Sequence, residues 1–313
     1  MNSEAFKTQI LMIGGPTATG KSALAVALAK RFSGEVINGD AYQIYTGMDI
    51  GTAKVTPAEM AGVPHHLVDI VAPGTPFSAA QFAARATAAI EAVSGRGHLP
   101  IVVGGTGFYL NTLRLGLNLG GAAPPAGLRA ALNAELAAAG PAALHKRLEA
   151  VDPAAAAAIP EGNPRRVIRA LEVAATGQLF SRQQQSPPAY DALVLGLTTE
   201  RSALYARINA RVDQMLTAGL LAEVRRVVAA AGPEAQALRA IGYKEFLPYL
   251  NGDCDLAAAV AAVKQNSRRY AKRQLTYFRH QMPTHWFDLV AHPEELKDVE
   301  ALVASWQTKE NKH

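Results

Sequence analysis

The sequence predicts an α/β fold in which helices flank a parallel sheet that carries a phosphate-binding loop. The loop is Gly15-Pro16-Thr17-Ala18-Thr19-Gly20-Lys21-Ser22, a G-x-x-x-x-G-K-S match that follows an apolar strand over residues 10–13. An Ala- and Leu-rich helix is expected directly after it, over residues 22–30. Strands and helices alternate up to about residue 105, as in a sheet covered on both faces. Together these observations predict a core of the P-loop NTPase type.

The predicted strands bring three polar groups to one edge of the sheet. A second strand over residues 35–38 ends at Asp40, and a further strand over residues 99–103 is followed by Thr106. In parallel sheets, ligands bind at the carboxyl ends of the strands. We therefore expect Asp40, Thr106 and the phosphate loop to line one cleft.

The later part of the chain is mostly helical and predicts an insertion into the core. After a Gly/Pro-rich break, Ala-rich helices extend to about residue 176, and a strand over residues 193–197 returns to the sheet. We predict an α/β core of residues 1–117 and 191–313, with a helical insertion domain of residues 118–190. Further helices are expected over residues 78–93, 200–231, 256–279 and 293–307, and a Gln/Ser/Pro-rich loop over residues 181–188.

Composition excludes several classes of protein. Cys254 is the only cysteine, so neither an internal disulfide nor a Cys-rich zinc site can form. No apolar run reaches the length that spans a membrane, and the first residues do not have the form of a signal peptide. We expect a cytoplasmic monomer that is not attached to a membrane.

Positive charge is concentrated in two segments, although the net charge is only +5. Residues 256–287 contain no acidic residue, and a second basic cluster lies at Arg165, Arg166 and Arg169. Such clusters suit a polyanion larger than one nucleotide, with a solvated basic helix face as the alternative. The basic residues singled out in the first segment are Lys264, Arg268, Arg269, Lys272, Arg273 and Arg279.

The phosphate loop predicts a site for a di- or triphosphate without specifying ATP. Its glycines let backbone N–H groups point inward, Lys21 adds a positive charge, and Ser22 is the usual Mg²⁺ ligand. P-loop hydrolases usually carry an acidic residue at a neighbouring strand tip, where this chain has Gly104-Gly105. These glycines suggest that a ligand approaches the backbone closely. The missing acid argues against an ATPase motor and leaves a small kinase open.

Other polar residues are candidates for the chemistry. Asp40 can act as a general base or a Mg²⁺ ligand, with a plain turn residue as the alternative. Gln43 can meet the edge of a base. Arg207 and Arg211 lie one helical turn apart and can close over a phosphate. Alternatively, these two arginines pair with the acidic neighbours Asp213 and Glu200 on a surface helix.

Taken together, these segments resemble the bacterial tRNA dimethylallyltransferase (isopentenyltransferase) family in the family's own order. The stretch 47–54 is the most specific of them. The resembling segments are residues 15–22, 40–54, 64–70, 103–107, 164–172, 240–245 and 271–279. The resemblance implies transfer of a dimethylallyl group from dimethylallyl diphosphate to N6 of the adenosine 3′-adjacent to the tRNA anticodon. Pyrophosphate is released, Mg²⁺ is the cofactor and no ATP is consumed.

The resemblance also implies roles for individual residues. Asp40 would be the base, while Thr19, Lys21, Ser22, Arg211 and Mg²⁺ would stabilise the departing pyrophosphate in the phosphate loop. Gln43 and Thr106 would meet the flipped-out adenosine, and the insertion would embrace the anticodon stem-loop. The implied tRNA-binding residues are Asp40, Ala41, Tyr42, Gln43, Thr106, Asn163, Pro164, Arg165, Arg166, Val167, Arg169, Lys244, Lys272, Arg273 and Arg279.

Three alternatives remain open at this point. A P-loop nucleotide or small-molecule kinase shares the loop and the sheet, but it does not explain residues 47–54 or the acid-free basic segment. An adenylate isopentenyltransferase that acts on free nucleotides would not need the basic C-terminal helices. In a nucleotide-gated RNA-binding module without catalysis, Asp40 would only bind Mg²⁺.

Overall fold

The computed structural model describes residues 7–117, 124–182 and 188–308. The chain divides into two compact units. The first unit consists of Met1–Leu117 and Pro188–His313, and the second of Asn118–Pro187. Within the described ranges, no helix is both long and apolar enough to cross a membrane.

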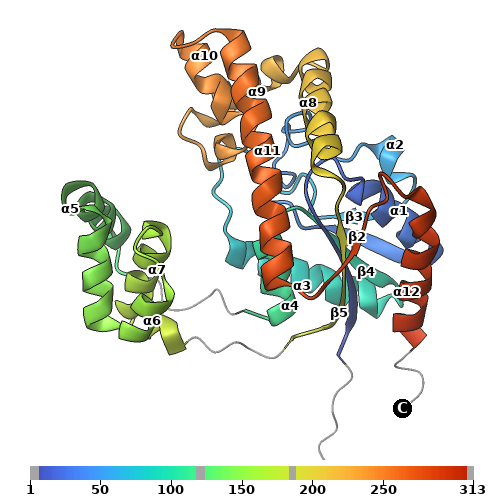
Figure 1. Ribbon diagram of the computed structural model, residues 1–313, viewed down its shortest axis with the longest axis horizontal. Helices are drawn as coiled ribbons and strands as arrows, with labels where there is room; N and C mark the ends of the chain where they lie inside the picture. The colour runs from blue at the N-terminus through green and yellow to red at the C-terminus, as the bar shows by residue number, and fades with distance from the viewer. Residues whose placement is uncertain (1–6, 118–123, 183–187, 309–313) are drawn as a thin grey trace, which may run out of the picture. The chain divides into compact units, whose positions relative to one another are not determined.

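The first unit is built on a six-stranded parallel sheet in the order β3-β2-β4-β1-β5-β6 (Figure 1). This arrangement confirms the predicted α/β class. Strand β6 was not expected, because its four residues lack the continuous apolar run of a buried strand. In the structure they are only partly buried or exposed. The strands are β1 (Gln9–Gly14), β2 (Gly34–Asn38), β3 (His65–His66), β4 (Leu99–Val103), β5 (Asp191–Leu197) and β6 (Thr284–Phe287).

Helices cover both faces of this sheet because successive side chains of a strand point to opposite sides. On β1, Ile10 and Met12 pack with α3, α4, α9 and α11, whereas Leu11 and Ile13 pack with α1 and α12 (Figure 1). The helices of this unit are α1 (Lys21–Arg31), α2 (Pro57–Met60), α3 (Ala79–Gly95), α4 (Gly107–Leu115), α8 (Arg201–Thr217), α9 (Leu220–Ala231), α10 (Leu247–Asn251), α11 (Leu256–Gln281) and α12 (Leu296–Thr308). Short 3₁₀ turns are η2 (Gln236–Arg239), η3 (Lys244–Phe246) and η4 (Pro293–Glu295).

Local signals explain where several helices begin and end. Ser78 caps α3 as predicted, in a capping box with Gln81. The helix expected over residues 200–231 is interrupted, because Gly219 adopts a left-handed conformation with φ of 99°. Two helices, α8 and α9, therefore replace the single expected one.

The second unit is helical, with α5 (Leu128–Val151), α6 (Pro153–Ala158), α7 (Pro164–Ala174) and the 3₁₀ turn η1 (Phe180–Arg182). Asp152 and Asn163 cap α6 and α7, and each is followed by a proline in the first turn. The helices share their own apolar core, formed by residues such as Leu144 and Val167. The expected loop over residues 181–188 lies largely outside the described residues.

A buried carboxylate anchors the first residues of β2. Both Nε and Nη2 of Arg96 donate to Glu35, at 3.0 and 2.7 Å, and His66 Nε2 and His98 Nδ1 lie 2.6 and 2.7 Å from its oxygens. These contacts, led by the Arg96 hydrogen bonds, lower the pKa of Glu35 from 4.5 to about 2. The ionised form of Glu35 therefore stabilises the folded state.

We expect Glu35→Gln to lower the free energy of unfolding at pH 7, because a neutral amide loses the charge-assisted hydrogen bonds of the carboxylate. The expected loss is about 2 kcal/mol, less than the full pKa shift implies, because the partners are partly exposed and solvent screens the charges. Because the folded pKa lies below the unfolded value, this contribution is complete above about pH 5 and fades as the pH falls towards about 2. Urea unfolding of both proteins at pH 7, 5 and 3 measures the difference. A difference that stays constant from pH 7 to pH 3 would contradict the ionic origin of the stabilisation.

Candidate active site

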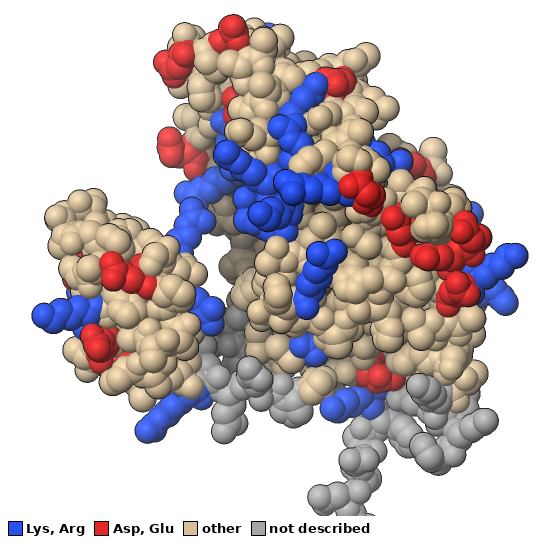
Figure 2. Space-filling model, viewed as in Figure 1, with Lys and Arg blue, Asp and Glu red and all other residues tan. Residues whose placement is uncertain are grey.

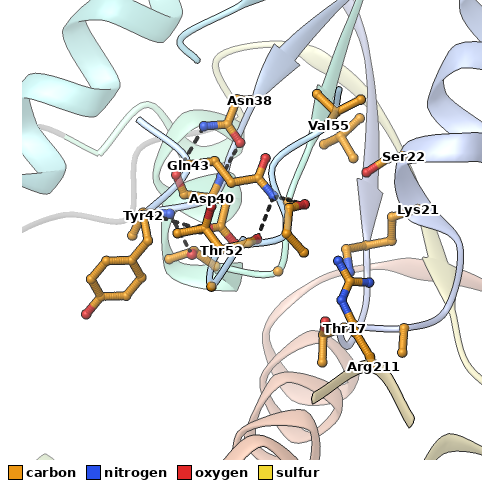
Figure 3. Close-up of a pocket in the computed structure, with 18 of the residues that line it drawn as sticks. Thr17, Lys21, Ser22, Asn38, Asp40, Tyr42, Gln43, Thr52, Val55 and Arg211 are labelled. Carbon is orange, nitrogen blue, oxygen red and sulfur yellow. Dashed lines mark hydrogen bonds between the residues drawn. The ribbon is translucent and has the colours of Figure 1, made fainter. Parts of the chain in front are cut away.

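A cavity of about 1100 Å³ opens at the carboxyl edge of the sheet in the first unit. The phosphate loop, Asp40 and Thr106 all line it, so the structure brings together the three groups that the strands were expected to place there. Further lining residues come from within the stretches 51–55, 208–215, 239–244 and 263–274, among them Thr52, Met215, Arg239 and Ser267. Figure 3 shows Lys21, Ser22 and Arg211 on one side, across from Asp40, Tyr42 and Gln43.

The phosphate loop has the backbone that its sequence predicts. Gly15, Ala18 and Gly20 have φ values of 132°, 65° and 89°, and α1 begins at Lys21 directly after Gly20. A Cβ atom on Gly15 would lie 2.5 Å from the carbonyl oxygen of Leu197, so this position also requires glycine for packing on β5. The positive end of α1 thus faces the cavity.

Two residues of the loop bind the same carbonyl group. Thr19 Oγ1 donates to the Pro16 oxygen at 2.9 Å, and Lys21 Nζ donates to it at 2.6 Å. Thr19 is only 2 % exposed and does not line the cavity, so here its hydroxyl supports the loop rather than facing a ligand. Burial lowers the pKa of Lys21 to about 8, although the nearby Asp40 opposes this shift.

Asp40 is held by the turn that follows β2. Its backbone N–H donates to Asn38 Oδ1 at 3.0 Å, and its Oδ1 accepts the N–H of Tyr42 at 2.9 Å. Burial raises the pKa of Asp40, and the hydrogen bond from Tyr42 and the charge of Lys21 oppose the rise. The residue is therefore both a turn residue and a carboxylate with increased basicity.

Another part of the cavity wall comes from α11, which packs beside Ala18 of the phosphate loop. Thr106 Oγ1 accepts the N–H of Ala41 at 3.2 Å and also bonds the hydroxyl of Tyr270. Gln274 Nε2 donates to the carbonyl oxygen of Gly105 at 2.9 Å. Burial raises the pKa of Tyr270 to about 12, so its hydroxyl stays protonated. Neither Tyr270 nor Gln274 was singled out from the sequence, although they lie one helical turn apart on one face of α11.

The α8 arginines face the phosphate loop. Arg207 Nε donates to the Ala18 carbonyl oxygen at 2.8 Å, and Arg211 lines the cavity with a pKa lowered by burial. The acidic neighbours have other partners: Asp213 pairs with Lys264 at 2.6 Å, and Glu200 caps α8. The two arginines therefore do not pair with these acids, and their closure over a phosphate stays a prediction.

The remaining predicted RNA contacts fall in three places. Ala41, Tyr42, Gln43, Lys244 and Arg273 line the cavity. Lys272 and Arg279 are exposed on α11 outside it, and Figure 2 shows Lys and Arg side chains gathered over α8 and α11. In the second unit, Arg165 and Arg166 are exposed and Arg169 is half-buried near Glu172, at 3.5 Å, while Pro164 starts α7 and Asn163 caps it.

Val167 corrects one expectation. Its side chain is fully buried in the core of the second unit, so it cannot touch an RNA directly and serves packing instead. Its neighbours Arg165 and Arg166 lie on the opposite, exposed face of α7 because a helix turns by 100° per residue.

Comparisons with known proteins show which family the chain belongs to. The sequence matches the family described as IPP transferase over residues 43–281. It is 59% identical over 299 residues to the tRNA dimethylallyltransferase of Lacticaseibacillus casei, covering 95% of this chain and 97% of the relative. The crystal structure of the full-length tRNA isopentenylpyrophosphate transferase from Bacillus halodurans is 44% identical, with a TM-score of 0.75, over 98% of this chain and 99% of that one.

A eukaryotic dimethylallyltransferase acting on tRNA, captured in crystallographic snapshots, is more distant in sequence. It is 29% identical, with a TM-score of 0.80, over 98% of this chain and 80% of its own. The curated relative and the solved structures thus match nearly the whole chain, and the family match covers residues 43–281 of it. This chain belongs to the IPP transferase family.

Proposed function

We propose that this protein transfers a dimethylallyl group from dimethylallyl diphosphate to N6 of the adenosine 3′-adjacent to the anticodon of tRNA. The observation that carries the proposal is the arrangement of one cavity, with the phosphate loop on one side and the half-buried carboxylate of Asp40 on the other. Membership of the IPP transferase family and the tRNA dimethylallyltransferases among its relatives support it. A reaction on tRNA suits the cytoplasm, and we propose that the protein acts there as a monomer.

The reaction breaks the bond between C1 of the prenyl group and the diphosphate oxygen, and forms a bond between C1 and N6. Asp40 takes the proton that N6 gives up, because the adenine amine is a weak nucleophile whose lone pair is delocalised. Burial favours this step, since it raises the pKa of the carboxyl and hence its basicity. Gln43 and Thr106 meet the adenine after it leaves the stack of the RNA loop.

Pyrophosphate departs on the other side of the cavity. Lys21, Arg211 and the N–H groups of the phosphate loop stabilise the negative charge that develops on it. Thr19 supports the loop indirectly, because its hydroxyl donates a hydrogen bond to the Pro16 carbonyl oxygen that also accepts one from Lys21. Since this charge grows in the transition state, each contact lowers the barrier as well as binding the donor.

The donor set suits a Mg²⁺ ion that arrives with the diphosphate. Ser22 is exposed to the cavity and offers one hydroxyl. In the part of the chain that the structure describes, no three His, Cys, Asp or Glu side chains could hold a metal ion. Mg²⁺ commonly binds through few protein ligands, phosphate oxygens and water. When bound, the ion would neutralise charge on the diphosphate, with Ser22 as its protein ligand.

The exposed arginines and lysines of α11, Lys244, and Arg165, Arg166 and Arg169 of the second unit are proposed to hold the tRNA backbone. Such contacts make affinity depend strongly on salt. We propose that the second unit binds the anticodon stem-loop.

One assay separates this function from its alternatives. Labelled dimethylallyl diphosphate is incubated with Mg²⁺ and unmodified tRNA without ATP, alongside free AMP. Label on tRNA alone supports the proposal. Label on AMP alone would point to the enzyme that acts on free nucleotides, and no transfer with ATP-dependent phosphorylation would point to a kinase.

The pKa of Lys21 predicts a pH dependence for donor capture. Because burial lowers this pKa to about 8, the free enzyme loses the Lys21 charge as the pH rises through that value. We expect kcat/KM for dimethylallyl diphosphate to fall above pH 8, by up to about tenfold per pH unit. In Lys21→Arg this decline should vanish, because arginine stays protonated. A wild-type profile that is flat up to about pH 10 would contradict the assignment.

A further inference from the structure

The carboxylate of Glu223, on α9, lies at the meeting point of two distant segments. Its Oε2 accepts the backbone N–H groups of Asp49 and Ile50, each at 2.9 Å. Its Oε1 accepts the N–H of Gly51 at 2.9 Å and the hydroxyl of Tyr243 at 2.6 Å. Residues 47–54 and 240–245, which the family resemblance singles out, are thus joined by a residue outside both.

This carboxylate is buried, with Glu223 only 1 % exposed. Among the described residues, no lysine or arginine forms an ion pair with it, so backbone N–H groups and one hydroxyl replace water around the charge. Burying a charge is unfavourable unless each lone pair finds a donor. The turn at residues 49–51 must therefore keep its three N–H groups pointed at one carboxylate.

Packing reinforces the same geometry. A Cβ atom on Gly51 would lie 2.4 Å from Cε2 of the Tyr243 ring, so only glycine allows this ring to reach Glu223. Lys54 closes the segment from the other end, with Nζ donating to the Tyr45 carbonyl at 2.7 Å and to Asp49 at 2.6 Å. Residues 49–54 are thus held at both ends.

The segment that Glu223 holds forms part of the cavity wall. Gly51, Thr52 and Ala53 line the cavity, and the carbonyl oxygens of Thr52 and Ala53 accept Gln43 Nε2 at 3.2 and 3.3 Å. Gln43 lies beside Asp40 (Figure 3). Glu223 itself does not line the cavity, so any influence on substrate passes through this wall.

We propose that Glu223 is a positioning residue for the acceptor nucleoside: it fixes the turn at residues 49–51, and through it Gln43, next to Asp40. This inference rests on the proposed function, because it assigns Gln43 to the acceptor side. The phosphate loop is outside the network, so donor binding should not depend on Glu223. Replacing a residue that is needed only for stability would instead change the KM values for tRNA and for the donor alike.

The test compares Glu223→Gln and Tyr243→Phe with Glu35→Gln. Glutamine keeps the shape of Glu223 but presents an NH₂ group to backbone donors. Tyr243→Phe keeps the ring and removes only the hydroxyl, with its hydrogen bonds to Glu223 and to the Gly51 backbone. Glu35 is an equally buried carboxylate, 3 % exposed, whose partners belong to a separate cluster, so its variant controls for lost stability. Steady-state transfer is measured with tRNA and with donor varied separately, together with amide hydrogen exchange of residues 44–56.

We expect Glu223→Gln to raise KM for tRNA by about tenfold or more, and Tyr243→Phe to raise it less, with KM for the donor changed by less than about twofold. Exchange at Asp49, Ile50 and Gly51 should accelerate in both variants and not in Glu35→Gln. If Glu223→Gln unfolds, Tyr243→Phe alone carries the comparison.

Two results would overturn the inference while the proposed function stands. One is an unchanged KM for tRNA in a folded Tyr243→Phe or Glu223→Gln variant. The other is an equal rise of both KM values, as expected from general loosening. A wild-type protein that transfers no label to tRNA would instead overturn the proposed function, and this inference with it.

Discussion

Asp40→Asn is expected to lower kcat by about a hundred- to ten-thousandfold while both KM values change by only a few-fold. Asparagine keeps the size of the side chain, and its Oδ1 can still accept the N–H of Tyr42, so the turn after β2 should survive. What it loses is the ability to take the proton from N6. Single-turnover transfer of labelled dimethylallyl to tRNA measures the chemical step directly.

The same variant should be at least as stable as the wild type. Burial raises the pKa of Asp40 in the folded protein, so the ionised carboxylate at neutral pH opposes folding, and a neutral amide removes that penalty. Thermal unfolding with and without dimethylallyl diphosphate checks this point. A drop in kcat of less than about tenfold would leave Asp40 as a turn residue only and would move the base elsewhere.

Local signals account for the parts of the fold and site that the sequence predicts well. The phosphate loop follows from the order of strand, glycines and helix, and Asp40 follows from its place at the end of a strand. Both depend on residues close together in the chain, which a pattern can capture. The capping box at Ser78 and the caps at Asp152 and Asn163 belong to the same class.

The residues that the sequence did not reveal depend on contacts between distant segments. Glu223 looks like an ordinary surface charge of a helix, and only the fold shows it buried against residues 49–51. Gln274 and Tyr270 lie in a segment that stood out for its charge, while the face of α11 that meets the cavity follows from its packing on α4 and α8. Val167 shows the converse, since its place between arginines suggested RNA but its helical phase buries it.

The two glycines after β4 line the cavity as expected, but packing within the protein is the stronger reason why they are glycines. Gly104-Gly105 suggested close approach of a ligand, and both residues do line the cavity. The tightest neighbours, however, belong to the protein. A Cβ atom on Gly104 would lie 2.3 Å from the carbonyl oxygen of Gly39, and one on Gly105 would lie 2.1 Å from Gln274 Nε2. The missing acid of P-loop hydrolases thus reflects a strand tip where no side chain fits.

Gly104→Ala is therefore expected to lower the free energy of unfolding by about 1–3 kcal/mol and kcat by about a hundredfold. The new methyl group meets the backbone of Gly39, which cannot rotate away, and Gly39 directly precedes Asp40. The N–H of Gly39 donates to the Val103 carbonyl oxygen at 2.7 Å, so the methyl group can be accommodated only if β2 and β4 separate at their tips. Urea unfolding and single-turnover transfer measure the two effects.

Two further glycines calibrate this result. A Cβ atom on Gly95, the last residue of α3, would meet nothing within 4 Å beyond its own helix, and its φ is not left-handed. Gly95→Ala should therefore be neutral or stabilising by up to about 1 kcal/mol. Gly105→Ala should fall between the two, because the side chain of Gln274 can move whereas the Gly39 backbone cannot. The order of the three variants follows from what each methyl group meets. If Gly104→Ala were as stable and as active as Gly95→Ala, the tight approach of β2 and β4 would not be what places Asp40.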